Sequence, residues 1–267
     1  MIIVGIALAL GILLSLLIPA SKPSIQLATT TSLDNSGLLK ALLPTFEQRH
    51  GVAVHVIATG TGKALKLGEN GDVDVLLVHA PPAERAFIDN GCGIGRTTFM
   101  KNDFVIIGPK DDPAGISGEA DVVKALKKIS AAATTFVSRG DDSGTHKKET
   151  ALWKAAGLTP AGPWYLETGQ GMGATLKIAD EKKACTLTDR GTFLAFEDKT
   201  ELVVLSAGDP RLENLYSVIL VNPARHPHVK AKAAALLSRW LCSDEANSII
   251  SSFRVKGKIL FHFIERK

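Results

Sequence analysis

Four short segments of this sequence combine glycines with small hydroxyl residues, a pattern suited to binding an anion. Each follows a predicted strand and precedes a predicted helix. A helix N-terminus leaves backbone N–H groups without partners and carries partial positive charge. Glycine lets a ligand approach the backbone, and Ser and Thr hydroxyls add donors. Several such termini around one cleft would hold a dehydrated oxyanion. The segments are TTTS (29–32), TGTGK (59–63), SRGDDSGT (138–145) and GQGMG (169–173).

Arg139 supplies the positive charge in the third segment. Its guanidinium can present two parallel N–H groups to one anion, and Ser143, four residues on, opens a predicted helix. Two other interpretations stay open. Arg139 can form a salt bridge with Asp141 or Asp142, and any single Ser or Thr can serve as an ordinary helix cap.

Strands and helices alternate along the chain, which predicts an α/β fold with parallel sheets flanked by helices. The run at 73–78 is continuously apolar, as in a strand buried on both faces. A helix is predicted at 36–50, with Pro44 interrupting it. Further strands are predicted at 25–28, 52–58, 104–108, 134–138, 185–188, 202–205 and 216–221, and further helices at 122–131, 143–156, 173–183 and 229–241.

The strands and helices form two sets, which predicts two lobes joined by two hinge crossovers near 104–110 and 203–217. Residues 24–106 and 207–267 would form lobe I, and residues 107–206 lobe II. The apolar segment 259–264 would pack on lobe I. Since ligands of open α/β sheets bind beyond the carboxyl ends of strands, the site is expected in the cleft between the lobes.

The first twenty residues differ from the rest. Residues 2–18 are uncharged and almost all aliphatic, and they are followed by Pro19 and Ala20. This run is short for a membrane span and suits the core of a signal peptide cleaved after Ala20. No basic residue precedes the run, so an uncleaved membrane anchor is the alternative. Either way, we expect the protein to work outside the cytoplasm.

Composition excludes several classes of function. The 267 residues carry a net charge of +4 with no long basic run, and aromatic residues make up 6%, which argues against nucleic-acid binding. Cys92, Cys185 and Cys242 form no CxxC pair and are expected to be buried small side chains. One disulfide among them stays open, because the sequence does not choose a pair.

The known catalytic motifs do not fit. Thr61 and Lys63 lie in a segment similar to a phosphate loop, but Ile57 and Ala64 occupy positions where that motif needs Gly and Ser or Thr. Ser143 with His146 is the one pair that suggests a hydrolase of phosphate esters. No orienting group is evident beyond Asp141 or Asp142, so this is the least favoured hypothesis.

Eight segments together resemble the periplasmic tungstate-binding proteins of ABC transporters. The resemblance covers nearly the whole chain after the leader, with the motifs in the family's order. They are ATTTS (28–32), NSGLL (35–39), GTG (60–62), GENGDVDVLLVHAP (68–81), NDF (102–104), SRGDDSGTHKKE (138–149), WYLETGQGMG (164–173) and TDRGT (188–192).

The resemblance implies a type II periplasmic binding fold, whose two lobes close over one anion. Tungstate would be the ligand, with molybdate as the alternative, and an ABC membrane permease the partner. The protein would be a monomer with no cofactor, no other metal and no catalytic residues. The implied anion contacts are Thr30, Thr31, Ser32, Thr61, Arg139, Ser143, Gly144 and Thr145, and the implied cleft-lining residues are Gly171, Met172 and Gly173.

His79 bears on which anion is bound. Similar phosphate-binding proteins place an acidic residue near this position, where it accepts the proton of phosphate. Tungstate, molybdate and sulfate carry no such proton, so a site made of donors suits them and penalises phosphate. Asp141 or Asp142 could also supply an acceptor, and His79 could be purely structural. A phosphate or sulfate binder and a membrane-anchored oxyanion sensor therefore remain alternatives.

Overall fold

The computed structural model describes residues 22–264. The leader predicted at 1–20 lies outside these residues. Within 22–264, no helix is both long enough and apolar enough to cross a membrane. The predicted lobe boundaries stay a prediction, and we keep the names lobe I and lobe II for the two predicted parts.

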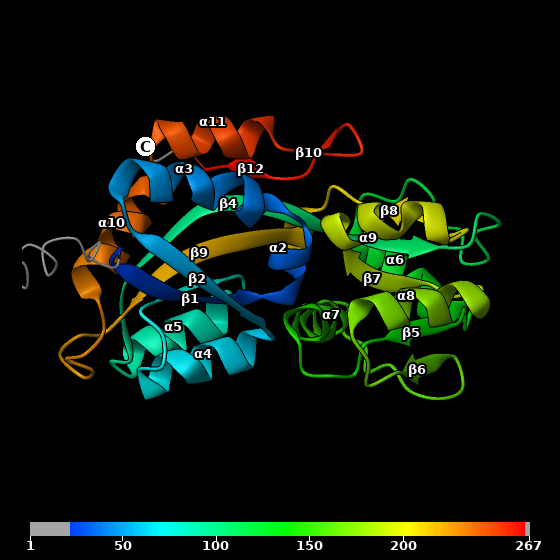
Figure 1. The fold of residues 1–267 in the computed structure, drawn as a ribbon. Coiled ribbons are helices and arrows are strands. Elements are labelled where there is room, and N and C mark those ends of the chain that lie inside the picture. The colour runs from blue at the N-terminus through cyan, green and yellow to red at the C-terminus, as the bar shows by residue number, and fades with distance from the viewer. Residues whose placement is uncertain (1–21, 265–267) are drawn as a thin grey trace, which may run out of the picture.

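Lobe I is built on one sheet with the strand order β12-β4-β9-β3-β1-β2 (Figure 1). β1 pairs in parallel with both β2 and β3, whereas β9 joins β3 in the antiparallel sense. The connecting helices complete βαβ units, as the alternating pattern predicted. The elements are β1 (Ser24–Thr30), α2 (Thr31–Asn35), α3 (Leu38–His50), β2 (Ala53–Thr59), α4 (Thr61–Asn70), β3 (Val75–Val78) and α5 (Pro81–Asp89).

Lobe II is built around a shorter parallel arrangement. β5 pairs in parallel with β6, and Phe136 bridges in parallel to Cys185. β7 and β8 pair antiparallel with the end of β4. The elements are α6 (Val122–Ala131), β5 (Phe136–Ser138), α7 (Gly144–Ala155), β6 (Tyr165–Glu167), α8 (Met172–Glu181), β7 (Thr186–Asp189), α9 (Arg190–Phe196), the 3-10 turn η1 (Glu197–Lys199) and β8 (Val203–Ser206).

Two crossovers join the lobes, as predicted. The first is β4 (Gly93–Gly108), a strand of 16 residues that pairs with β9 in lobe I and with β7 and β8 in lobe II. The sequence pattern identified only its last five residues. The second runs from β8 through the 3-10 turn η2 (Pro210–Leu212) into β9 (Glu213–Val221). Figure 1 shows β4 passing from the blue and cyan half to the green half, and the yellow connection after β8 returning to β9.

The predicted helix at 36–50 differs from the structure at its beginning. α3 begins at Leu38, because Gly37 separates it from the short helix α2 and adopts φ +83°, a conformation suited to glycine. Pro44 does not interrupt the helix, because α3 continues through it to His50.

The C-terminal segment packs on lobe I, as expected. β12 (His262–Phe263) pairs with β4, and the neighbouring Leu260 and Phe261 are buried. The other elements of this part are α10 (Ala231–Leu241), α11 (Asp244–Ser252), β10 (Arg254–Val255) and β11 (Lys258–Ile259).

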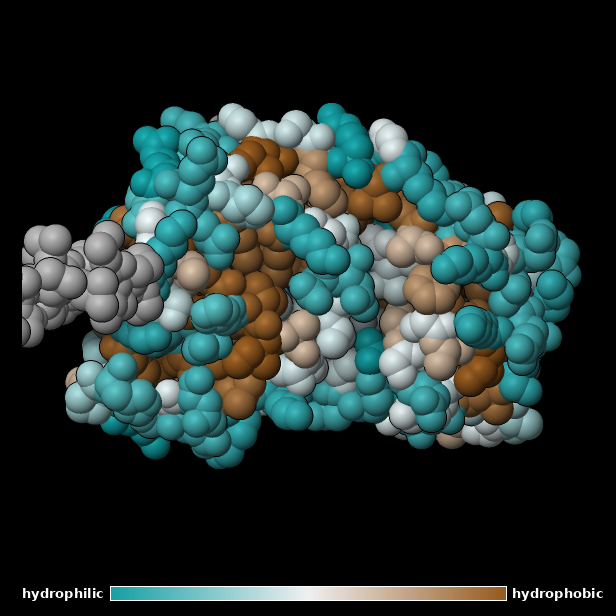
Figure 2. Space-filling model, viewed as in Figure 1, coloured by the Kyte–Doolittle hydropathy of each residue, from teal (hydrophilic) through white to brown (hydrophobic). Residues whose placement is uncertain are grey.

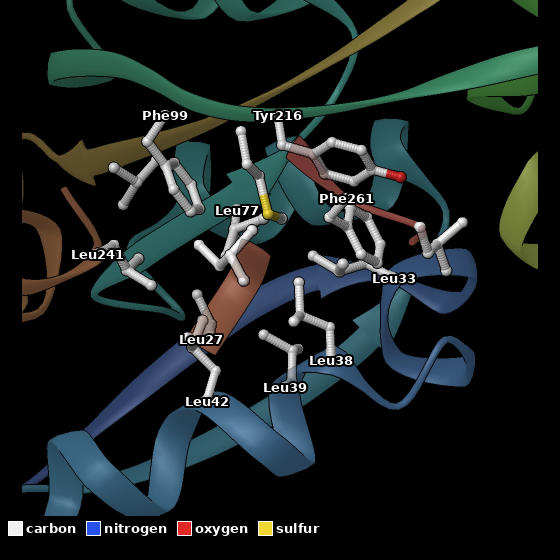
Figure 3. Close-up of a cluster of buried hydrophobic side chains, with 14 of the residues drawn as sticks. Leu27, Leu33, Leu38, Leu39, Leu42, Leu77, Phe99, Tyr216, Leu241 and Phe261 are labelled. Atoms are coloured by element: carbon white, nitrogen blue, oxygen red, sulfur yellow. The ribbon is translucent and has the colours of Figure 1, made fainter. Parts of the chain in front are cut away.

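The largest core cluster lies between the lobe I sheet and its helices and continues into lobe II through β5, α8 and α9. Figure 3 shows Leu27 and Leu77 from neighbouring strands facing Leu39 and Leu42 of α3. β3 is buried along its whole length, as its continuous apolar run predicted. Cys92 and Cys185 are buried thiols in two other clusters, which confirms their prediction as small core side chains.

The surface is unevenly apolar. In Figure 2 the largest apolar area lies on lobe I below α3, around β2. β2 is the edge strand of the sheet, and Val54, Val56 and Ile57 are half-buried there. Most of the surface over lobe II is hydrophilic in this view.

Candidate functional site

Each of the four polar segments stands directly before a helix, as predicted. Thr30 is the N-cap of α2, and its side chain accepts from Leu33 N. Ser143 caps α7 and accepts from His146 N. Gly60 and Gly171 cap α4 and α8 without a side-chain hydrogen bond. The hydroxyls of Thr30 and Ser143 therefore cap helices, but each keeps a hydrogen that it can donate elsewhere.

A cavity of about 290 Å³ lies between α2 of lobe I and α8 and α9 of lobe II. Six of the predicted site residues line it, namely Thr31, Ser32, Arg139, Gly171, Met172 and Gly173. The walls also include Asn35, Ser36, Gly191, Thr192, Ala195 and Phe196, and Ala174 completes the lining. Sequence reasoning did not assign these residues to the site, although Thr192 ends the TDRGT motif.

The other predicted residues form a second cluster beside this cavity. A Cβ atom built on Gly144 would lie 3.3 Å from Thr61 Oγ1, so the starts of α4 and α7 are in close contact. Thr61 and Thr145 are both buried. Thr30 Oγ1 lies 3.2 Å from Ser32 Oγ, which connects the first polar segment to the cavity wall. The structure thus brings segments of both lobes together.

Arg139 connects the cavity to the start of α7. Its Nη2 donates to Asp141 Oδ2, and Asp141 Oδ1 accepts from Ser143 N at 3.2 Å. Burial opposes ionisation of Asp141, but the hydrogen bonds from Ser143 and the charge of Arg139 hold its pKa below the usual value. The predicted salt bridge with Asp141 therefore exists, and it orients the guanidinium. Asp142 pairs with Lys147 instead.

Two buried donors of the site have no hydrogen-bond partner among the described residues: Thr61 Oγ1 and Arg139 Nε. The Thr61 side chain is on lobe I, and the Arg139 side chain, 15% exposed, is on lobe II. A buried donor without a partner costs free energy that a bound acceptor would recover. Both atoms therefore have an unused capacity to donate to a ligand oxygen.

His79 lies at the bottom of the same region, directly after β3. It is buried, and its Nδ1 lies 2.8 Å from Asn214 Oδ1. Its ring stacks on Tyr216 at 4.8 Å. Nε2 lies 3.5 Å from Ser32 Oγ, at the outer limit of a hydrogen bond.

The Ser143–His146 pair does not have the geometry of a nucleophile and its base. Ser143 Oγ accepts from the backbone N–H of His146 rather than from its ring. The His146 ring accepts from Asp142 N through Nδ1 and lies 4.0 Å from Glu167 on its other side. Within residues 22–264, no group of three His, Cys, Asp or Glu residues is placed to hold a metal ion.

Comparisons with known proteins agree on one family. Residues 19–245 match the model of the PBP superfamily domain. The chain is 47% identical over 235 residues to the tungstate-binding protein TupA of Peptoclostridium acidaminophilum, an alignment covering 87% of this chain and 82% of that protein.

Solved structures give the same result. The tungstate-binding protein TupA of Desulfovibrio alaskensis G20 superposes with a TM-score of 0.83 at 49% identity, covering 91% of this chain and all of that one. The tungstate ABC transporter structure from Geobacter sulfurreducens gives a TM-score of 0.80 at 52% identity, covering 86% of this chain and 98% of that one.

Proposed function

We propose that this chain, which belongs to the PBP superfamily and within it to the family of the tungstate-binding proteins TupA, captures tungstate and delivers it to an ABC importer. It would act outside the cytoplasm as a monomer, with a membrane permease as its partner. It would carry out no reaction on its ligand and need no cofactor.

The observation that carries this proposal is the pair of buried donors without partners, Thr61 Oγ1 and Arg139 Nε. They come from opposite lobes, beside the N-terminus of α7. An anion between them would satisfy both at once and add the unpaired backbone N–H groups of that helix. Donors from both lobes would also make contacts that only the closed form completes, and such differential contacts drive closure.

The composition of the site favours an anion that carries no proton. Among the carboxylates near the site, Asp141 is the one that could accept from a protonated oxyanion, but both its oxygens already accept, one from Arg139 and one from Ser143. An oxyanion with four bare oxygens needs donors only. Tungstate meets this requirement, as do molybdate and sulfate, and the family relationship favours tungstate.

The decisive experiment is calorimetric titration of the purified protein with tungstate, molybdate, sulfate and phosphate. We expect one-to-one binding of tungstate, weaker or equal binding of molybdate, and no heat from phosphate. Binding of sulfate or phosphate alone would keep the transport role but overturn the tungstate assignment.

The alternatives have separate tests. A membrane-anchored sensor would retain its leader, so N-terminal sequencing of the exported protein distinguishes it from a released carrier. A phosphate-ester hydrolase would turn over an aryl phosphate. The hydrogen bonds of Ser143 and His146 to backbone N–H groups argue against that reading.

A further inference from the structure

The hydrogen bonds around Asn214 determine which nitrogen of His79 carries a proton. Asn214 Nδ2 donates to Asn102 Oδ1 at 2.8 Å and to Tyr216 Oη at 3.1 Å, so both of its hydrogens are used. The amide oxygen of Asn214 faces His79 Nδ1 at 2.8 Å. With the Asn214 amide in this orientation its oxygen accepts, so Nδ1 is the donor. In a neutral imidazole Nε2 is then a bare acceptor.

This bare nitrogen faces the anion site. Nε2 lies 3.5 Å from Ser32 Oγ, and Ser32 lines the cavity between the lobes. On the other side, a Cβ atom on Gly144 would stand 3.3 Å from His79 Cε1 and 3.3 Å from Thr61 Oγ1. The imidazole edge therefore lies among residues that we assign to the anion.

A lone pair directed at a dianion is repulsive, whereas an N–H at the same atom would be an additional donor. The net charge of the site also favours a protonated His79 when a dianion is bound. The guanidinium of Arg139 is already paired with Asp141, so a dianion would lack a full counter-charge. One proton added to His79 would remove the repulsion and supply the missing charge.

We propose that His79 determines proton-linked binding: it is neutral in the free protein and takes up one proton from solvent when a dianion enters the site. The inference rests on the proposed function. In the complex, Nε2–H donates to an anion oxygen and Nδ1–H continues to donate to Asn214.

The surroundings of His79 fit a neutral side chain in the free protein. Burial holds its pKa below the usual 6.5, although the Asn214 hydrogen bond and the charge of Asp189 oppose this effect. Lys148 of α7 lowers it further. The remaining neighbours from α2, α4, β4 and β9 are uncharged: Ser32, Thr61, Asn102, Asn214 and Tyr216.

The test is titration with tungstate in buffers of different ionisation enthalpy, from about pH 6.5 to about pH 8.5. We expect close to one proton taken up per tungstate at the pH values where free His79 is neutral and bound His79 is charged. Affinity should rise as pH falls, by up to about tenfold per pH unit in that window. His79→Gln should bind with no proton uptake and with nearly constant affinity.

His55→Gln is the matched control, since His55 is an exposed histidine on β2. It should behave as the wild type. Tungstate binding without proton uptake would overturn the inference and leave the proposed function standing, whereas no tungstate binding at any pH would overturn both. A pH dependence that persists in His79→Gln and disappears in His146→Gln would assign the proton to the neighbouring loop and also overturn it.

Imidazole nitrogen NMR gives a measurement that needs no variant. In the free protein the His79 signals should show hydrogen on Nδ1 and none on Nε2, and both nitrogens should carry hydrogen once tungstate is bound. Hydrogen on Nε2 in the free neutral ring would mean that the Asn214 amide is turned the other way, which would overturn the proposal.

Discussion

Gly144 approaches Thr61 so closely that a methyl group on Gly144 would lie 3.3 Å from Thr61 Oγ1. The first residue of α7 in lobe II and the first residue of α4 in lobe I thus share one small space. The only polar atom of the Thr61 side chain has no partner among the described residues. We expect an anion oxygen to bind next to this contact. Substitutions of Thr61 and Gly144 therefore test the proposed site directly.

Thr61→Val should make the protein a weaker binder without making it less stable. Valine keeps the shape and removes a buried hydroxyl that has no partner in the free protein, so the free energy of unfolding should stay equal or rise by up to about 1 kcal/mol. Tungstate affinity should fall by about tenfold to a hundredfold, the effect of losing a hydrogen bond to a charged group.

Calorimetry and urea unfolding measure the two effects. Thr61→Ser, which keeps the hydroxyl, is the control and should bind nearly as the wild type does. A Thr61→Val protein that is less stable and binds normally would place the hydroxyl outside the site.

Gly144→Ala should weaken binding by more than about tenfold while the melting temperature stays the same or rises. The added methyl group would occupy space between Thr61 and His79. Alanine is also the better helix former by about 1 kcal/mol, which offsets the tight contact in the free protein. Unchanged affinity in a titration would show that the ligand does not use this space.

Arg139→Lys should lose at least about tenfold in affinity although the charge is kept. Lysine has no counterpart of the buried Nε and cannot hold Asp141 and an anion in one planar group. Arg49→Lys is the control, because Arg49 pairs with Glu245 on the exposed surface. If Arg139→Lys binds as the wild type does, Arg139 acts only as a diffuse charge.

Ser143→Gly separates the two roles of Ser143. Glycine is nearly as good an N-cap as serine, costing a few tenths of a kcal/mol, whereas alanine costs about 1 kcal/mol. If the Ser143 hydroxyl donates to the anion, Ser143→Gly should lose about tenfold in affinity with little change in melting temperature. A loss of stability and affinity only in Ser143→Ala would mean that Ser143 is purely a cap.

Glu149→Gln should stabilise the protein most at neutral and higher pH. Burial raises the pKa of Glu149 to about 7, although hydrogen bonds from Tyr165, Ser138 and Trp153 oppose this effect. The folded state therefore holds the proton more tightly, and the wild type loses stability as pH rises from about 4.5 to about 7. Glutamine cannot ionise, and its oxygen can accept from Trp153 and Tyr165 as Glu149 Oε1 does.

Urea unfolding of both proteins across that pH range measures the difference. It should be small near pH 4.5, grow to on the order of 1–3 kcal/mol near pH 7, and stay level above that. Glu181→Gln, at an exposed carboxylate of α8, is the control and should change stability little at any pH in this range. A difference that is constant with pH would mean that Glu149 titrates normally.

Local sequence pattern was sufficient for most of the strands and for the polar helix starts, but it did not predict α5 or α11. β3 was evident from its apolar run, and Ser143–Gly144 from its cap chemistry, because both depend on neighbours in the chain. The start of α3 at Leu38 was less evident, since Gly37 breaks the helix where a periodic apolar pattern continues.

Contacts between distant segments could not be read from the pattern. Thr192 of α9 lines the cavity because β7 and β4 place α9 opposite α2, and the TDRGT motif alone does not indicate this position. Asn214 determines the tautomer of His79 from 135 residues away. The absence of a hydrogen-bond partner for Thr61 Oγ1 and Arg139 Nε among the described residues likewise depends on segments that are distant in the sequence, so only the folded structure shows it.

The position of β9 between β3 and β4 has a consequence for synthesis on the ribosome. β3 and β4 lie on opposite sides of β9, so the lobe I sheet cannot close until residues 213–221 have emerged. All of residues 109–212 are made before then. Lobe II can therefore assemble on the free end of β4 while the lobe I sheet is still incomplete, with β3 lacking the strand that pairs with it on its other side. During translation and export, the unfinished half that a chaperone must shield is the N-terminal one.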